Sequence, residues 1–279
     1  MPTYTCLLLC LSAAFFSCDE DLKTFKTIIT DKPGEPARSI RGISLPQGFK
    51  NVDKTDTTYA NWLLDIKLRQ STTVYLYNGD LKGNQLVQFS VLDINIGKKD
   101  LVQCADAAIK LRADFLFHNK RYEEIKFKVT SGDEISFTRW LKGTRWKEKA
   151  GKLVPYLINK TIRNINDEYK SFMEIVFAYC GTYSLSKQLK PVTSIDSILA
   201  GDVFIQGGFP GHAVTVMAVA KNYEGKKIFL LSQGYMPAQD IHILKNYGDP
   251  GLSPWYSVND IYPLHTPEWQ FESGSLKRW

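Results

Sequence analysis

The stretch GDVFIQGGFPGHAVTVMAVAKNYEGKKIFLLSQGYMPAQD, residues 201–240, decides the fold. It contains three apolar runs, at residues 203–205, 213–220 and 228–232, and each run is bounded by Gly, Pro or Asn. Such runs predict buried strands, so we expect three successive strands here. His212 lies where a Gly-rich turn enters the second strand. A side chain held at the rim of a rigid sheet suits a functional site.

The flanking segments show helical spacing and strand-like alternation. Residues 101–117 form an Ala- and Leu-rich helix, and Asp100 and Gln103 fit a capping box at its start. A second long helix is expected over residues 167–179. We predict one α+β domain over residues 43–279, with an antiparallel sheet packed against helices.

The composition is that of an ordinary globular protein. Of the 279 residues, 44% are hydrophobic, and the lysines behind the net charge of +6 are scattered along the chain. This charge weakly favours an anionic surface or substrate and does not indicate nucleic acid. The histidines and cysteines lack the spacing of a metal site, so we expect neither a metal nor another cofactor.

The N-terminal segment is apolar and is followed by a cysteine and an acidic patch. Residues 6–16 are too few to span a bilayer and are typical of a secretory signal peptide. A small residue precedes Cys18, which resembles the bacterial lipobox, and the acidic residues 19–21 resemble the export signal of surface-exposed lipoproteins. We therefore expect a signal over residues 1–18, lipidation of Cys18, a tether over residues 19–42, and a location at the outer membrane or cell surface. A plain cleaved signal, with Cys18 left free, is the alternative.

Cys104 is the better candidate for a reactive thiol. The predicted capping places it in the first turn of its helix, where unpaired N–H groups and the helix dipole lower a thiol pKa. Cys180 lies at the opposite end of its own helix, where the dipole opposes a thiolate. Two alternatives stay open. Cys104 shares a helical face with Ala108 and can be a core thiol, or it can form a disulfide with Cys180.

His212 is the candidate general base by elimination. His118 ends the Cys104 helix, about 20 Å from the thiol. His242 alternates with isoleucines in a strand-like run that we expect at the surface, and His265 lies in the C-terminal tail. The alternative role for His212 is that of a purely structural imidazole.

A Cys–His pair needs a third group that orients the imidazole. In the predicted hairpin, His212 lies opposite Gly234 and shares its face with Ser232. A slip of one residue puts Gln233 on that face instead, because side chains alternate along a strand. Since Asn, Gln or Asp is the usual orienting residue, we favour Gln233 and keep Asp240 as the reserve candidate.

An aromatic and basic segment offers a candidate substrate-binding surface. Trp140, Arg145 and Trp146 combine flat apolar rings with a guanidinium group. We expect them to line a groove for an anionic and partly apolar substrate. A simple amphipathic surface helix is the alternative interpretation of this segment.

Two short blocks carry a resemblance to known enzymes. GDVF at residues 201–204 and GHAV at residues 211–214 give a Gly-Asp-led strand followed by a His-led strand. With Cys104 early in a helix, this order resembles the papain-like, NlpC-type peptidases and amidases. The resemblance implies a papain-like core and a hydrolase of cell-wall peptides that uses Cys104, His212 and a polar third residue.

Longer segments match one family across most of the chain. They are LKGNQ (81–85), QCADAAIKLRA (103–113), GDVFIQGGFPGHAV (201–214), SQGYMPAQDIHILKN (232–246) and SPWY (253–256). On these segments the chain is identified as a member of a family of bacterial lipoproteins with a domain of unknown function, number 4846. The sequence thus predicts a surface or outer-membrane lipoprotein with cysteine hydrolase activity. The alternative is a non-catalytic, ligand-binding lipoprotein in which Cys104 is buried or bonded to Cys180.

Overall fold

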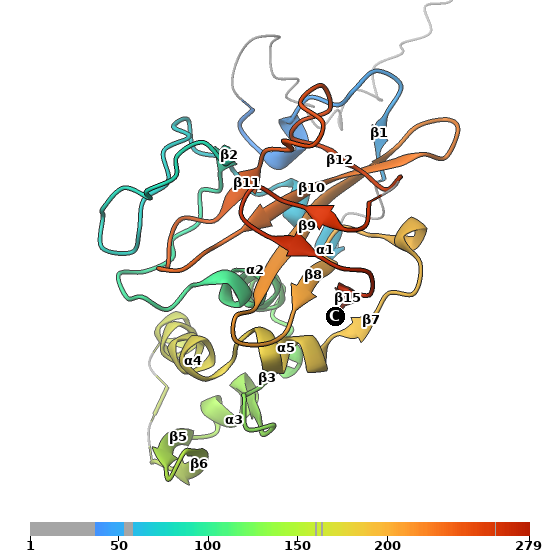
Figure 1. Cartoon of the computed structure of the whole chain (residues 1–279). Coiled ribbons are helices and arrows are strands. Elements are labelled where there is room, and N and C mark those ends of the chain that lie inside the picture. The colour runs from blue at the N-terminus through green and yellow to red at the C-terminus, as the bar shows by residue number, and fades with distance from the viewer. Residues whose placement is uncertain (1–36, 53–57, 160, 163, 260) are drawn as a thin grey trace, which may run out of the picture.

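The fold is built around the long hairpin of β9 (His212–Lys221) and β10 (Lys227–Gln233), which crosses the centre of the molecule (Figure 1). The computed structural model describes residues 37–52, 58–159, 161–162, 164–259 and 261–279. Together with β8 (Val203–Gln206), the hairpin provides the three strands expected from the apolar runs. Nearly all of its side chains are buried, because apolar residues occupy both faces of β9 and β10.

One antiparallel sheet contains most of the strands. Its order is β2 (Gln88–Val91), β11 (His242–Leu244), β10, β9, β8, β15 (Leu276–Arg278) and β7 (Lys190–Pro191). Two short strands also join it, β1 (Lys50–Asn51) on β9 and β12 (Tyr256–Ser257) on β10. The structure confirms the predicted α+β class, a single domain with an antiparallel sheet packed against helices.

Different segments cover the two faces of this sheet. On one face, α1 (Tyr59–Leu64) and α2 (Cys104–His118) pack against the central hairpin, where Leu111, Met217 and Leu230 belong to one hydrophobic cluster. On the other face lies the C-terminal segment with the hairpin β13 (Leu264–His265) and β14 (Gln270–Phe271), drawn red in front of the sheet in Figure 1. Burial on both faces explains why β9 is apolar almost throughout.

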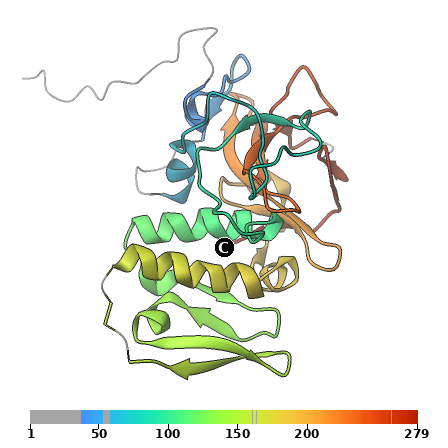
Figure 2. The same ribbon diagram turned by 90° about the vertical axis from the view of Figure 1, so that its left-hand side faces the viewer.

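A second layer packs on the outer side of α2. α4 (Ile165–Tyr179) runs alongside α2, and two small hairpins lie beyond it (Figure 2). These hairpins are β3 (Lys126–Lys128) with β4 (Glu134–Ser136) and β5 (Thr144–Lys149) with β6 (Lys152–Leu157). The remaining helices are α3 (Phe137–Leu141), α5 (Thr182–Gln188) and the 3-10 turns Ile40–Gly42, Tyr122–Glu124 and Ile195–Ser197.

A β-bulge interrupts the pairing of β9 with β10. Leu230 pairs with Ala218, but the next residue, Leu231, pairs with Val216. Met217 is therefore left without a partner, and the register shifts by one residue from this point to the start of β9. The shift decides which side chains of β10 share a face with the start of β9.

The described fold begins before the expected domain start at residue 43. Ile40 is buried, and Ser39 forms a β-bridge with Lys67. The end of the expected tether is thus packed onto the domain, because its apolar residues complete the core beside α1. Cys18 and the expected signal lie outside the described residues. Within the described part of the chain, no helix combines the length and apolar character needed to cross a bilayer.

Candidate functional site

Cys104 is the first residue of α2, and Gln103 is its N-cap. The backbone N–H of Gln103 donates to Asp106 Oδ2 at 3.2 Å, so the capping box joins these two residues and not Asp100 with Gln103. Asp100 Oδ1 instead accepts from the side chain of Gln103 at 3.0 Å and from the backbone N–H of Ala238 at 2.7 Å. These bonds tie the start of α2 to the loop after β10 and so fix the position of the thiol.

Gly234 lets the end of β10 approach the start of α2. A Cβ atom at this position would lie 2.9 Å from the backbone oxygen of Gln103 and 3.2 Å from Cβ of Ala107. Contacts this close force the backbone to shift, so glycine is the residue that fits. The close approach places Cys104 beside the start of β9.

The Cys104 thiol contacts the backbone on either side of His212. Its Sγ donates to Gly211 O over 3.8 Å, and the backbone of Ala213 also forms a hydrogen bond that favours the thiolate. Burial has the larger effect: Cys104 is only 6% exposed, and desolvation raises its pKa to about 11. Backbone groups at the start of α2 do lower this pKa, as predicted, but burial outweighs them, because the thiol is more buried than its place in a first helical turn indicates.

The ring of His212 is enclosed by aromatic side chains. Its centroid lies 5.1 Å from that of Tyr235, 5.2 Å from that of Trp269 and 6.0 Å from that of Phe271. His212 is 1% exposed, and burial lowers its pKa to about 4. The imidazole is therefore neutral at pH 7 and can accept a proton.

Gln233 lies on the same face of the sheet as His212. Beyond the bulge in β9, Ser232 pairs with Thr215. Gln233 therefore falls opposite Val214, two residues along β9 from His212, and side chains at such positions share a face. Its Oε1 is 3.0 Å from His212 Nε2. This is the arrangement expected of a residue that orients the imidazole.

The two other candidates for the orienting residue do not reach the ring. Ser232 points to the opposite face, and its buried hydroxyl has no hydrogen-bond partner among the described residues. Asp240 Oδ2 instead binds Arg69 Nη1 at 2.8 Å and the backbone N–H of Tyr75 at 3.0 Å. Of the three residues, Gln233 alone contacts His212 in the described part of the chain.

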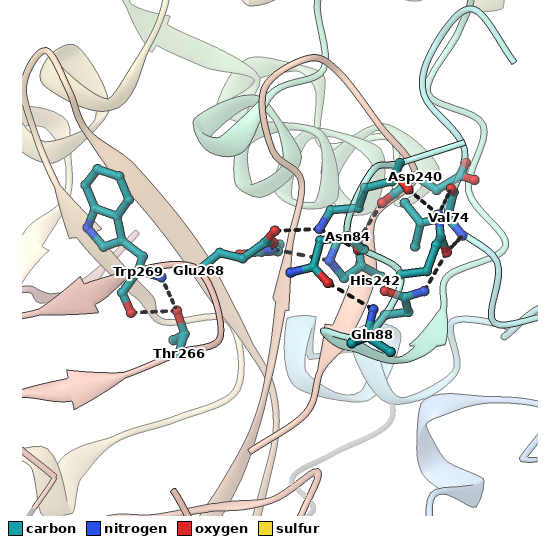
Figure 3. A network of polar contacts seen from close by, with 12 residues as sticks. Val74, Asn84, Gln88, Asp240, His242, Thr266, Glu268 and Trp269 are labelled. Atoms are coloured by element: carbon teal, nitrogen blue, oxygen red, sulfur yellow. Dashed lines mark hydrogen bonds and ion pairs between the residues drawn. The ribbon is translucent and has the colours of Figure 1, made fainter. Parts of the chain in front are cut away.

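A buried polar network continues from Gln233 away from His212. Gln233 Nε2 lies 2.6 Å from Glu268 Oε2 and 3.3 Å from His242 Nε2. His242 Nδ1 lies 2.9 Å from the backbone oxygen of Asp240, and Glu268 Oε1 forms an ion pair of 2.6 Å with Lys82 Nζ. Figure 3 shows Glu268 extending from the C-terminal segment toward His242. The network thus joins three separate segments of the chain behind the His212 ring.

The prediction that His242 lies at the surface is wrong. His242 is 0% exposed because β11 is an interior strand, paired with β10 on one side and β2 on the other. Burial lowers its pKa to about 4, which makes a second neutral imidazole in the network.

Cys104 and His212 meet at the start of β9, where the thiol lies against the strand backbone and the imidazole ring extends toward Trp269 and Phe271. In the described residues, no hydrogen bond joins the thiol to the imidazole, and the thiol bonds to Gly211 O instead. The two groups are adjacent along the chain of β9 but are not engaged with one another in this structure.

Cys180 is free, and so is Cys104. The structure therefore does not contain the disulfide considered as an alternative. Cys180 caps the C-terminus of α4, and its burial together with the nearby Asp106 raises its pKa.

Trp140, Arg145 and Trp146 do not line an exposed groove. They are 6%, 8% and 7% exposed and belong to the core of the second layer. Arg145 Nη2 and Trp140 Nε1 both bind Glu168 Oε2, at 2.9 and 2.7 Å, and the guanidinium lies 3.6 Å from the centroid of the Trp140 ring. The expectation of a substrate groove is corrected accordingly, because the hairpin of β5 and β6 folds back and buries these side chains.

The structure offers no cluster of metal ligands in its described residues: no three His, Cys, Asp or Glu side chains lie close enough to hold an ion. Two cavities of 650 and 390 Å³ adjoin α2, one beside α1 and one beside α4. Neither is lined by Cys104 or His212. Cys104 and His212 are both buried in this structure.

Three members of the network were missed at the level of sequence: Lys82, His242 and Glu268. A lysine in a short polar segment and a glutamate in the C-terminal tail carry no periodicity that signals burial. The sequence did hold one clue, since Lys82 and His242 fall within segments 81–85 and 232–246, which match the family.

The fold and the site define a class of protein: an antiparallel α+β domain in which a cysteine on a helix lies beside a histidine on a strand. The model of the family described as domain of unknown function (4846) matches residues 40–278, and the chain belongs to this family. No curated protein and no solved structure gives a significant match to the chain.

Proposed function

We propose that the protein is a cysteine hydrolase that cleaves peptide or amide bonds. Two observations support the proposal: the Cys104 thiol lies against the backbone on either side of His212, and Gln233 holds the His212 ring. A thiol, an imidazole and a group that orients the imidazole are the components of nucleophilic cysteine catalysis. The order of these elements resembles papain-like, NlpC-type enzymes, which supports a papain-like core.

The first step forms a thioester. The Cys104 side chain turns from Gly211 O toward Nδ1 of His212, which takes the thiol proton as Sγ bonds to the substrate carbonyl carbon. Negative charge develops on the carbonyl oxygen, and backbone N–H groups at the start of α2 are placed to stabilise it. When the carbonyl re-forms, the C–N bond breaks and the imidazolium gives its proton to the leaving amine.

The second step consumes one water. The water oxygen attacks the thioester carbon while His212 accepts a proton from it. The C–S bond then breaks, Cys104 regains its proton from the imidazolium, and the acid product leaves. Gln233 keeps the ring in one orientation through both steps, because its Oε1 holds Nε2.

We propose that the substrate enters between the turn before β9 and the turn after β10. Tyr235 and Trp269 are half-buried against the His212 ring, while Phe209 and Met236 are exposed in the turns before β9 and after β10. A substrate that displaces these half-buried rings reaches the thiol and meets apolar side chains on its way.

The substrate class and location complete the proposal. We propose a cell-wall peptide as substrate, by analogy with the NlpC-type enzymes. A lipid anchor on Cys18 would hold the enzyme at the outer membrane or cell surface, where its net charge of +6 suits an anionic envelope. Mass spectrometry of the membrane-extracted protein checks the anchor, since Cys18→Ser removes the acyl mass.

A non-catalytic, ligand-binding lipoprotein is the second candidate. The observation in its favour is burial: Cys104 is 6% exposed and its pKa is raised to about 11. On this alternative the thiol is a core residue and the polar network stabilises the fold alone.

A hydrolysis assay separates the two candidates. Purified cell-wall peptides are incubated with the wild-type protein, Cys104→Ala and Cys180→Ala, and new amino termini are identified by mass spectrometry. Cys180→Ala is the matched control, because it also removes a free, buried thiol. We expect cleavage by the wild type and Cys180→Ala and none by Cys104→Ala. Equal product from all three proteins, or from none, contradicts a role for the Cys104 thiol on this substrate.

A further inference from the structure

We infer that the buried ion pair of Lys82 and Glu268 sets the tautomer of His212, so that Nε2 carries the ring proton and Nδ1 is left to accept one. Neither side chain touches the His212 ring; both act through Gln233. They are therefore positioning residues. The functional consequence of this inference rests on the function proposed above, because a free Nδ1 matters only if His212 acts as a base.

The argument starts from the carboxylate of Glu268. Its Oε1 lies 2.6 Å from the ammonium of Lys82, and Lys82 is only 5% exposed. A carboxylate paired with a buried ammonium group only accepts hydrogen bonds. The group of Gln233 that lies 2.6 Å from Glu268 Oε2 must therefore be its NH₂ and not its oxygen.

His242 imposes the same orientation on the Gln233 amide. The backbone oxygen of Asp240 only accepts, so His242 Nδ1, 2.9 Å away, carries a proton and donates it. In the neutral ring, His242 Nε2 is then an acceptor. It lies 3.3 Å from the Gln233 nitrogen and takes the second N–H of that NH₂ group. Both protons of the amide nitrogen are thereby used.

The oxygen of Gln233 is left to face His212. It lies 3.0 Å from His212 Nε2 and only accepts, so Nε2 of the neutral ring must carry the proton. The lone pair of the neutral imidazole is then on Nδ1, the ring nitrogen nearer the backbone where the Cys104 thiol lies. A carboxylate held by a lysine thus fixes, through one amide, which nitrogen of His212 is basic.

The experiment reads the tautomer directly by ¹⁵N NMR of the histidine rings in the full-length protein. His212 is assigned from the signal lost in His212→Gln or, if that variant does not fold, from ring contacts with Trp269. For the wild type we expect a protonated Nε2 and an unprotonated Nδ1. A wild-type His212 with its proton on Nδ1 overturns the inference.

Glu268→Gln tests the ion pair while keeping the size of the side chain. The Lys82 ammonium group still donates to the oxygen of residue 268, so the NH₂ of the new amide is turned toward the NH₂ of Gln233. Two donors then face each other, and we expect His212 to lose its single tautomer. An unchanged His212 spectrum overturns the inference.

The double variant Lys82→Met with Glu268→Gln is the rescue. Without the ammonium group, the amide at position 268 can turn its oxygen toward Gln233 and restore the original orientation. We expect the wild-type tautomer of His212 to return. A merely structural role predicts the opposite, because the double variant removes more of the buried network. If Glu268→Gln does not fold, the His212 tautomers of the wild type and of the double variant test the inference without it.

Glu168→Gln is the matched control, since it breaks the buried ion pair with Arg145 in the second layer, away from His212. We expect it to leave the His212 tautomer unchanged. Failure of the proposed function is distinguishable from failure of this inference. The former appears as hydrolysis that does not depend on Cys104, or as no hydrolysis, with the predicted tautomer in place, and the latter appears as the wrong tautomer.

Discussion

Gln233 and His212 lie on different strands and are joined side chain to side chain, with Gln233 Oε1 3.0 Å from His212 Nε2. The contact exists because the bulge at Met217 shifts the register and turns Gln233 to the face of the His212 ring. Both residues are 1% exposed, so a polar group here that lacks a hydrogen-bond partner would destabilise the fold.

Replacement of Gln233 by Ala is expected to destabilise the protein by about 3 kcal/mol or more. It leaves His212 Nε2, His242 Nε2 and one Glu268 oxygen without their partner, and each unsatisfied buried group costs about 1–3 kcal/mol. Urea unfolding measures the change. The neighbouring Ser232→Ala is the control, because that buried hydroxyl has no partner to lose among the described residues. A Gln233→Ala effect no larger than that of Ser232→Ala contradicts the network.

The sequence could give the strands but not the face of Gln233. Continuous apolar runs predicted β8, β9 and β10, because both faces of these strands are buried. The same continuity hides the bulge, since a run without polar alternation does not reveal a one-residue shift of register. The choice of Gln233 therefore rested on the chemistry expected of an orienting residue and not on the pattern.

Acid is expected to destabilise the fold through the two buried histidines. Burial lowers the pKa of His212 and of His242 from 6.5 to about 4, so the unfolded chain binds these protons more tightly. Stability is therefore lost as the pH falls from about 6.5 and levels off below about 4, by about 3 kcal/mol for each ring. His242→Gln should remove about half of this loss in urea unfolding measured at pH 7 and pH 4.

Carboxylates also titrate in this range, so the quantity of interest is the difference between the variant and the wild type. An identical pH dependence for His242→Gln and the wild type argues against a neutral, buried His242.

Gly234→Ala is expected to move the start of α2 or to destabilise the protein by about 1–3 kcal/mol. The added Cβ would meet the backbone oxygen of Gln103 at 2.9 Å, and a backbone atom cannot yield as a flexible side chain can. Gly83→Ala, where a Cβ meets nothing within 4 Å, is the matched control. Equal stability and equal Cys104 reactivity in the two variants would contradict the close approach.

Trp140→Ala is expected to cost about 3–5 kcal/mol of stability, the usual cost of truncating a buried tryptophan. The exposed neighbour Lys147→Ala should change stability by no more than about 0.5 kcal/mol. Thermal unfolding distinguishes this core role from the substrate groove expected from the sequence. If Trp140→Ala leaves the stability nearly unchanged but weakens substrate binding, the result supports the substrate groove and contradicts the core role.

The groove was expected because Trp140, Arg145 and Trp146 look amphipathic when taken alone. Only the pairing of β5 with β6, together with Glu168 from α4, shows that the polar groups of Trp140 and Arg145 bind partners inside the protein. The pKa of Cys104 was misjudged for a related reason: a helix start predicts the dipole, but burial depends on segments far away in the chain.

The pH dependence of Cys104 alkylation tests the central claim, that His212 serves this thiol as a base, most directly. The experiment uses the Cys180→Ala variant, in which Cys104 is the remaining thiol among the described residues. The rate at which iodoacetamide alkylates Cys104 is followed by mass spectrometry from pH 5 upward. If neutral His212 takes the proton, the rate is nearly independent of pH between the two pKa values of about 4 and about 11, and His212→Gln lowers it by about tenfold or more. A rate that rises about tenfold per pH unit, and is the same in His212→Gln, shows an unassisted buried thiol and contradicts the claim.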